Sequence, residues 1–386
     1  MIDLTTCPVI DHHCHPYNPD KAVLEPELLA REFFHGRGDI PNQKAPRTWG
    51  ATEELRYHFR HMGVVNTMVR QLSRVFNCPA ELDTVAHERN RRTSSDFAAY
   101  ARLLYEDAGI VGTVVDADLP QNDPLLDLIP GTKLRLFKFE PLLQKLLLKA
   151  GSYKKLLMDF QEGLEKSIRE DGFIGVKAHL AEQVGFGTMP VWEDEAISIF
   201  PHAKAGNADA YKKLYTAVFT AILPQCQELG VPVHLHSGFT GGMWEGPIHN
   251  ADPFLLAPFL CHKEFLNTKI VLLHAGYPWI QQAGQMAHSF PHVWVDMGQV
   301  TPWASLRIVE CYRDAMAWAP LSKIVIGSGG HGSPEIAWLA ALTAKTALSE
   351  VLGDAIRLDL IETKYAEAVA RMILHDNASR LYGLDS

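Results

Sequence analysis

Short apolar runs alternate with longer helical stretches from about residue 110 onward. This alternation predicts a parallel sheet covered by helices. Together with a first run near the N-terminus, the runs predict eight strands, at Val9–His13, Ile110–Asp116, Leu134–Phe139, Phe173–His179, Val231–His236, Ile270–His274, Val293–Met297 and Ile324–Ser328. Eight parallel strands favour an α/β fold closed into a (β/α)8 TIM barrel over an open sheet.

Two connections between the predicted strands are long. Residues from about 20 to 108 have helical apolar spacing, which predicts a helical insertion after the first strand. Residues 181–206 follow the fourth strand, and connections of this length are usually lids or binding loops. Because the sequence shows no repeat or low-complexity linker, we expect residues 1–386 to form one barrel domain with insertions.

Composition excludes several classes of function. A formal net charge of −9 without a basic run argues against nucleic-acid binding, so we expect a small-molecule substrate. The chain lacks an apolar run of about 18 residues and a basic start followed by an apolar stretch, which predicts no membrane span and a cytoplasmic protein. Six cysteines without a CxxC pair predict reduced thiols. Helices around a barrel also suit pairing into a homo-oligomer.

Histidines cluster where the predicted strands end. In VIDHHCH, His13 and His15 lie two apart, so on an extended backbone they point the same way and could chelate one metal ion. A polar loop is the more frequent explanation of so short a motif, but here the pair follows an apolar strand. His234 and His236 share a face of the fifth strand, and His274 ends the sixth. Barrel active sites collect groups at these strand ends, so three clusters together predict a metal site.

Lys177 lies inside the apolar fourth strand, in GFIGVKAHL. A buried ammonium is costly, so something must compensate its charge. Burial would lower the pKa of the amine, which could then react with carbon dioxide to form a carbamate able to bridge two cations. Alternatively, the side chain reaches solvent at the strand end or pairs with a carboxylate.

Five motifs together resemble the amidohydrolase superfamily. They are IDHHCH after the first strand, GVKAHL at the fourth, HLHSG at the fifth, LLHAGYPW at the sixth and NASRLYGL near the end of the chain. Within that superfamily the sequence is most similar to the nodulin-like hydrolase branch, some of whose members are fused to a glutamine-synthetase-like domain.

The resemblance implies a ligand set and a reaction. His13 and His15 would bind the more buried metal ion, a carbamate on Lys177 would bridge to a second ion, and His236 and His274 would bind that second ion. Two zinc ions are favoured, although manganese or iron accepts similar ligands. The implied reaction is hydrolysis of a C–N amide bond in a small carboxylated substrate, with a γ-glutamyl amide suggested by the fused relatives.

The eighth strand departs from the pattern that the resemblance implies. The family has an aspartate at its end that accepts the proton of the attacking water, whereas KIVIGSGGHGSPE has Gly329 there. Glycine supplies neither a ligand nor a base, so we expect this chain to be impaired in catalysis. Either an engineered substitution or a natural variant that lost or rerouted its base would explain it.

Four residues are candidates for substrate binding. His234 would face the second coordination sphere or the substrate, and His331 could polarise a substrate or be a polar loop residue. Trp244 and Tyr277 follow the strand-five and strand-six ligands, where they could line the pocket or pack between loops. Two other functions fit the same residues, a metal-dependent nonoxidative decarboxylase and a noncatalytic protein that senses a ligand through its metal site.

Overall fold

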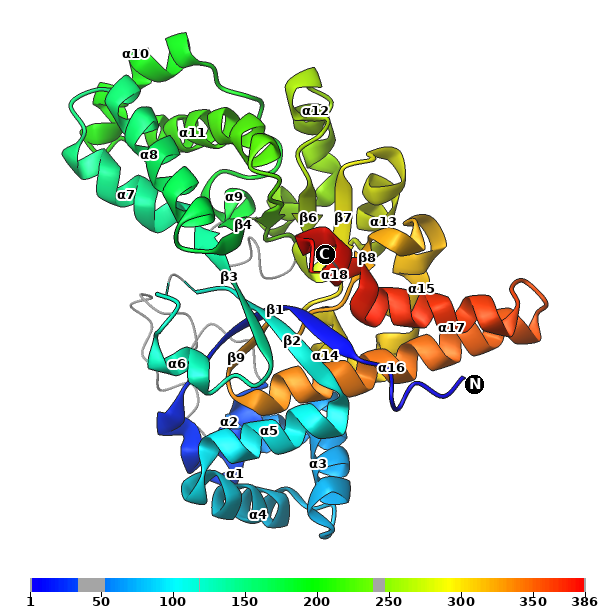
Figure 1. Ribbon diagram of the computed structural model, residues 1–386. Coiled ribbons are helices and arrows are strands. Elements are labelled where there is room, and N and C mark those ends of the chain that lie inside the picture. Colours follow the sequence, from blue (N-terminus) through cyan, green and yellow to red (C-terminus); the bar gives the residue numbers. More distant parts are fainter. Residues whose placement is uncertain (1, 34–52, 118, 239–246, 385–386) are drawn as a thin grey trace.

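The computed structural model describes residues 2–33, 53–117, 119–238 and 247–384. In these ranges, nine parallel strands form one curled sheet in the order β8-β7-β6-β5-β4-β3-β2-β1-β9 (Figure 1). The strands are β1 (Val9–Tyr17), β2 (Ile110–Val115), β3 (Thr132–Lys138), β4 (Phe173–Ala178), β5 (Val233–Leu235), β6 (Ile270–Leu272), β7 (Val293–Asp296), β8 (Ile324–Val325) and β9 (Gly330–Gly332). The fold is therefore the predicted α/β barrel.

The barrel closes between its first and last strands. The N–H of His12 donates to the carbonyl of Ile326 at 2.8 Å, and the N–H of Gly329 donates to the carbonyl of His13 at 2.6 Å. The predicted eighth strand Ile324–Ser328 is too long, because β8 ends at Val325 and β9 starts at Gly330. Gly329 has a left-handed φ of 61°, which interrupts the extended backbone between the two pieces.

The predicted insertion after the first strand forms helices on both sides of residues 34–52. Residues 34–52 themselves lie outside the described ranges. Its helices are η1 (Pro19–Ala22), α1 (Pro26–Arg31), α2 (Glu53–Arg60), α3 (Gly63–Phe76), α4 (Leu82–Ser95) and α5 (Phe97–Ala108). The last two are capped clearly, since Asp96 ends α4 and its side chain accepts from the Ala99 N–H at the start of α5. The insertion packs against the long helix α16 (Pro334–Arg357), with which α5 has an extensive contact.

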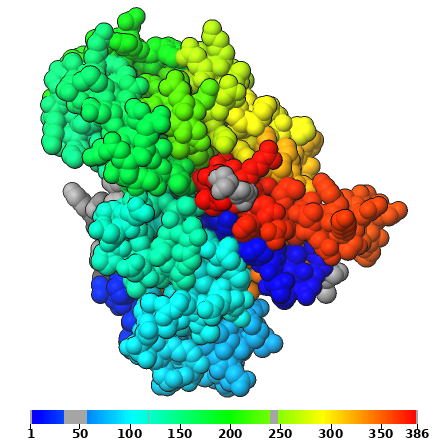
Figure 2. Space-filling model, in the orientation of Figure 1, coloured from blue at the N-terminus to red at the C-terminus, as the bar shows by residue number. Residues whose placement is uncertain are grey.

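A second group of helices follows β3 and β4. It comprises α7 (Phe139–Lys149), α8 (Tyr153–Arg169), α9 (Leu180–Gln183), α10 (Glu193–Lys204) and α11 (Ala208–Glu228). The predicted loop 181–206 is thus partly wrong, because α10 forms within it and packs along α11. In Figure 2 these helices (green) make up the upper left of the molecule, and the insertion helices (blue to cyan) make up the lower part.

The other helices cover the remaining strands and the end of the barrel. They are α6 (Pro124–Asp127), η5 (Ile248–Ala251), η6 (Pro253–Leu256), α12 (Ala257–Leu260), η7 (Lys263–Phe265), η8 (Leu273–Gly276), α13 (Ile280–Ser289), α14 (Val300–Trp303), η9 (Ser305–Arg307), α15 (Ile308–Trp318), η10 (Leu321–Lys323), α17 (Thr363–Arg371), the π-helical turn η11 (Met372–Asp376) and α18 (Asn377–Tyr382). Among described helices, α16 alone is long and apolar enough to cross a membrane, but 72% of that window is buried in the protein, as in a core helix.

Candidate metal centre

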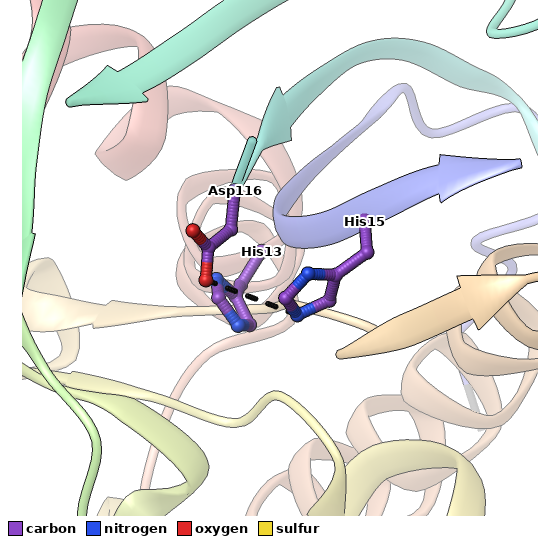
Figure 3. Close-up of side chains that lie close together, drawn as sticks. All are labelled: His13, His15 and Asp116. Carbon is purple, nitrogen blue, oxygen red and sulfur yellow. Dashed lines mark ion pairs between the residues drawn. The ribbon is translucent and has the colours of Figure 1, made fainter. Parts of the chain in front are cut away.

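Two histidines of β1 meet an aspartate that directly follows β2. His13, His15 and Asp116 each offer a ligand atom, and these atoms lie within 4.8 Å of one another (Figure 3). The Nε2 atom of His15 is 3.9 Å from Oδ2 of Asp116, and the two imidazole rings are 5.1 Å apart between centroids. Two imidazoles and a carboxylate in this arrangement form a donor set that suits zinc-like cations.

A second donor set lies at the ends of β4 and β5. His179, Glu182 and His236 also place their ligand atoms within 4.8 Å of one another, with Nδ1 of His236 3.3 Å from Oε1 of Glu182. Glu140 stands behind this set, because its Oε1 accepts from the His179 N–H at 2.7 Å and its Oε2 is 3.2 Å from His179 Nδ1. A carboxylate that holds the far ring nitrogen of a histidine leaves the other nitrogen directed toward a metal.

His274 lies between the two donor sets. Its ring centroid is 5.3 Å from that of His13 and 4.3 Å from that of His236. The residue has a left-handed backbone, with φ of 62°, and its N–H donates to Oδ1 of Asp296 at 3.2 Å. Such a conformation costs on the order of 1 kcal/mol or more outside glycine, so surrounding contacts must hold this side chain in the centre.

Lys177 is fully buried in β4. Its Nζ lies 2.9 Å from Nε2 of His179 and 3.4 Å from Nδ1 of His236. Burial lowers the pKa of this amine, while the carboxylates of Asp116 and Glu182 act in the opposite direction. The side chain therefore stays inside the centre, and the predicted alternative in which it extends to solvent is wrong.

Several ligand atoms of the centre are buried without a hydrogen bond among the described residues. They include Nδ1 of His13, both ring nitrogens of His274 and both carboxylate oxygens of Asp116. Asp116 does have an ionic contact, since its Oδ1 is 3.2 Å from the Lys138 ammonium. Buried polar atoms are normally paired, because leaving them unpaired costs about 1 to 3 kcal/mol each. Their unused lone pairs fit a bound cation.

The histidines are held in the neutral form that metal binding requires. Burial lowers the pKa of His15 to about 4 and that of His274 to about 3. Burial likewise lowers the pKa of His13 well below its usual value, helped by the neighbouring His15 and His274. Burial by itself would raise the pKa of Asp116, but His15 and Lys138 together hold it below its usual value. Near neutral pH the first donor set is therefore two imidazoles and a carboxylate.

A cavity of about 670 Å³ lies beside the second donor set, among α7, α9, α10 and α11. Glu182 lies at one side of it, and its Oε2 is buried with no hydrogen-bond partner among the described residues. Burial raises the pKa of this carboxyl to about 7. Lys204 and Lys212 line the cavity as well, together with the apolar side chains of Leu147 and Leu148.

Some of the predicted site residues lie in the centre and others do not. His13, His15, His236 and His274, which were predicted from strand-end positions, come together in the centre with Lys177, which was predicted from its place inside an apolar strand. His234 is completely buried and its Nε2 lies 2.9 Å from the hydroxyl of Tyr382. His331 is exposed and stacks on His15 with 3.7 Å between ring centroids, Tyr277 is 37% exposed, and Trp244 lies outside the described residues.

Three further residues of the two donor sets were not singled out from the sequence. Asp116 and His179 end the predicted second and fourth strands, so the strand-end rule that selected His13 and His274 could have found them too. Glu182 lies in the short helix α9, three residues beyond His179, and no periodicity marks it. Only the turn of the chain after β4 brings its carboxylate to His236.

Comparison with known proteins identifies the family. Residues 159–384, more than half of the chain, match the family model described as amidohydrolase. The chain therefore belongs to the amidohydrolase family. It is also 30% identical over 155 residues to Protein fluG of Emericella nidulans (strain FGSC A4), a match that covers 40% of this chain and 18% of that protein. The chain thus matches less than a fifth of that relative's length, and its placement in the nodulin-like branch stays a prediction.

Solved structures share the fold. A protein from Lactobacillus casei ATCC 334 described as a metal-dependent hydrolase has a TM-score of 0.82 and 20% identity, covering 100% of this chain and 98% of that one. Glucuronate isomerase from Caulobacter crescentus has a TM-score of 0.67 and 14% identity, covering 99% and 92%. An uronate isomerase from Bacillus halodurans C-125 has a TM-score of 0.63 and 14% identity, covering 98% and 94%. At these identities the likeness concerns the fold.

Proposed function

We propose that this protein is a metal-dependent amidohydrolase that cleaves a C–N amide bond in a small carboxylated substrate. One observation carries the proposal. Histidines from β1 and from the segments that follow β5 and β6 converge near Asp116, and several ligand atoms in this group are buried without a hydrogen bond among the described residues. Membership of the amidohydrolase family supports the same reading.

The donor sets fit two divalent cations. His13, His15 and Asp116 would hold one, His179, Glu182 and His236 would hold the other, and His274 lies within reach of both. Imidazole and carboxylate favour zinc, and manganese or iron accepts the same donors. When bound, such an ion lowers the pKa of water and polarises a carbonyl. In the same proposal a carbamate on Lys177 would supply further oxygen ligands between the two sets. The burial of Lys177 and the contacts of its Nζ to His179 and His236 support a place for this side chain within the centre.

The residues around the centre would bind and orient the substrate. Lys204 and Lys212 give the neighbouring cavity two cationic groups that suit a carboxylate, and Leu147 and Leu148 suit an aliphatic chain. Oε1 of Glu182 faces His236, so Oε2 would be available to accept a hydrogen bond from the same substrate. These features support a small substrate with an anionic end. The resemblance to the nodulin-like branch, some of whose members are fused to a glutamine-synthetase-like domain, makes a γ-glutamyl amide the first candidate.

Gly329 favours a second candidate function. Without a carboxylate at this position, the chain lacks the proton acceptor that the family resemblance implies, so it could bind a ligand at its metal site without turning it over. In either case the metal ions should be present. The two functions differ only in turnover.

Metal removal tests the proposal. We expect the purified protein to contain zinc, manganese or iron, and we expect a chelator to lower its melting temperature, which added Zn²⁺ restores. A ligand at 100 times its Kd stabilises a protein by about 2.7 kcal/mol. His13→Ala should lose most of this stabilisation, whereas His288→Ala, outside the centre, should keep it. A protein that binds none of these ions would refute the proposal.

A substrate screen then separates hydrolysis from binding. The metal-loaded protein is incubated with a panel of γ-glutamyl and other carboxylated amides, and the released amine is measured. Turnover by this chain or by a variant with an aspartate restored at position 329 supports the hydrolase. Binding without turnover by either supports the noncatalytic protein. Loss of carbon dioxide from an aromatic acid, without amide hydrolysis, would instead identify a decarboxylase.

A further inference from the structure

A hydrogen-bonded network, formed by one partly buried tyrosine and three buried side chains, lies beside the metal centre and contains none of its proposed ligands. The hydroxyl of Tyr382 is 2.7 Å from Nε2 of His12 and 2.9 Å from Nε2 of His234. On its other side, Nδ1 of His12 is 3.1 Å from Oδ2 of Asp296. The rings of His12 and His234 stack with 4.8 Å between centroids and an interplanar angle of 7°. Both histidines and Asp296 are completely buried.

Tyr382 reaches these groups from the C-terminal helix α18, which lies over the strands near the middle of Figure 1. Two small apolar clusters, separate from the main core, hold the helix there. Ala378 packs with Ile10 of β1 and Val325 of β8, and Leu381 packs with Val271 of β6 and with Leu273. The helix therefore presents one hydroxyl to two strands, β1 and β5, that are not neighbours in the sheet.

Asp296 connects this hydrogen-bonded network to the metal centre. Its Oδ1 accepts from the N–H of His274 at 3.2 Å and from the N–H of Gly298 at 2.8 Å. Two glycines leave room for the carboxylate, since a Cβ at Gly298 or at Gly327 would lie 2.5 Å from an Asp296 oxygen. The backbone of His274 is left-handed, and the hydrogen bond from its N–H to Asp296 is one contact that stabilises this conformation.

We propose that Tyr382 is a positioning residue for the metal centre. Through His12 it fixes the Asp296 carboxylate, which holds the backbone of His274, and through His234 it fixes a buried ring on β5, the strand that precedes His236. The inference rests on the proposed function, because it assigns Tyr382 a role in metal affinity. Without the hydroxyl, two buried ring nitrogens lose their partner, and the rings would have to turn to recover one.

Zinc affinity tests the role of Tyr382. Tyr382→Phe keeps the ring and removes only the hydroxyl, and its Kd for Zn²⁺ is measured by competition with a coloured chelator. Residues behind metal ligands typically change affinity by roughly 10 to 100-fold, and we expect a loss in that range. The visible absorption of the Co²⁺-loaded protein should change as well, because His274 shifts.

Tyr105→Phe is the matched control. Tyr105 is buried, whereas Tyr382 is partly buried. The hydroxyl of Tyr105 likewise has two partners, Tyr17 at 2.6 Å and Thr113 at 3.2 Å, but neither is a histidine. It should lower the melting temperature of the metal-free protein while leaving Zn²⁺ affinity and the Co²⁺ spectrum within twofold of the original. A purely structural role for Tyr382 would make the two variants behave alike.

The outcomes are separable. If Tyr382→Phe does not fold, Asp296→Asn tests the contact between Asp296 and the backbone of His274 instead. We expect the same loss of Zn²⁺ affinity. Unchanged Zn²⁺ affinity and an unchanged Co²⁺ spectrum in a folded Tyr382→Phe protein overturn the positioning role while leaving the metal centre intact. If the unmodified protein binds neither ion, the proposed function itself fails, and with it the basis of this inference.

Discussion

Gly329 has an unusual backbone at the position where the family resemblance implies an aspartate. Its φ of 61° suits glycine, and a Cβ at this position would overlap Cγ of Gln299. Gln299 is itself left-handed, with φ of 56°, and the N–H of Val300 donates to the carbonyl of Gly298 across it, which makes a tight γ-turn. An aspartate at position 329 therefore needs both a tolerant backbone and a neighbour that moves.

Gly329→Asp tests whether a carboxylate at this position supports catalysis. Gly329→Asp alone should destabilise the fold by about 1 to 2 kcal/mol because of the left-handed backbone and the overlap with Gln299. The double variant Gly329→Asp, Gln299→Ala should recover part of that stability and gain amide hydrolysis, since a positioned acid–base group contributes roughly 10² to 10⁴ in rate. Urea unfolding and amine release measure the two effects.

Gln299→Ala by itself is the control for the double variant. It should leave turnover at the level of the unmodified chain, because it adds no carboxylate. If the metal-loaded double variant folds but hydrolyses no member of the amide panel faster than this control does, the missing-base explanation is wrong.

At the scale of elements, a buried ion pair joins the insertion to the barrel. Nε of Arg89 in α4 is 2.7 Å from Oε1 of Glu335 at the start of α16, and both side chains are completely buried. Tyr100 of α5 donates to the same oxygen at 2.9 Å, and Nη1 of Arg89 donates to the carbonyl of Lys21 at 2.6 Å. Three helices and the segment after β1 thus share one charged group.

Removing one partner of this pair should be costly. Arg89→Met leaves the Glu335 carboxylate buried without its cation, and breaking such a pair typically costs about 3 to 5 kcal/mol. Arg89→Met, Glu335→Leu removes both charges and should cost less than the single variant, although it also removes the acceptor of Tyr100. Urea unfolding of the three proteins gives the comparison. Equal losses in the single and double variants would show that the charge itself is unimportant.

Element types follow from local patterns more reliably than element limits do. The apolar runs predicted all eight barrel strands, because a strand covered by helices on one face and packed in a barrel on the other is apolar along its length. The break between β8 and β9 was missed, since it depends on a left-handed Gly329 rather than on hydropathy. The helix α10 was missed because its packing against α11 and α8 exists only in the tertiary structure.

For the whole molecule, a buried histidine far from the centre predicts a pH dependence of stability. His292, just before β7, is 5% exposed, and neither ring nitrogen has a hydrogen-bond partner among the described residues. Burial, and to a lesser degree Lys323, lowers its pKa from 6.5 to about 4. Between these two pH values the unfolded chain binds more protons than the folded one, so this residue makes stability fall as pH falls.

His292→Leu isolates that contribution. The unmodified protein should lose up to about 3 kcal/mol relative to the variant between pH 7.5 and pH 4, since each pKa unit corresponds to 1.36 kcal/mol. Urea unfolding of the two metal-free proteins at several pH values measures the difference in their free energies of unfolding. The contributions of the other histidines are the same in both proteins and cancel. A difference in stability that stays constant over this pH range would contradict the lowered pKa.

The sequence by itself predicted the barrel, the family and five residues that the structure brings together in the candidate metal centre. Each of these depends on local patterns: alternating strands and helices, and polar side chains directly after apolar runs, which a parallel barrel gathers at one rim. His13, His15, His236 and His274 could be selected in this way because their strands had been predicted. Lys177 was selected for a different reason, because a charged side chain inside an apolar strand is costly to bury.

Tertiary structure alone decided which other groups join them. Glu182 reaches His236, Glu140 supports His179, and Tyr382 bridges His12 and His234 because the chain folds back over distances that no local period records. These contacts join residues that are remote in sequence. Such contacts exist only once the barrel has closed and α18 has packed against its strands.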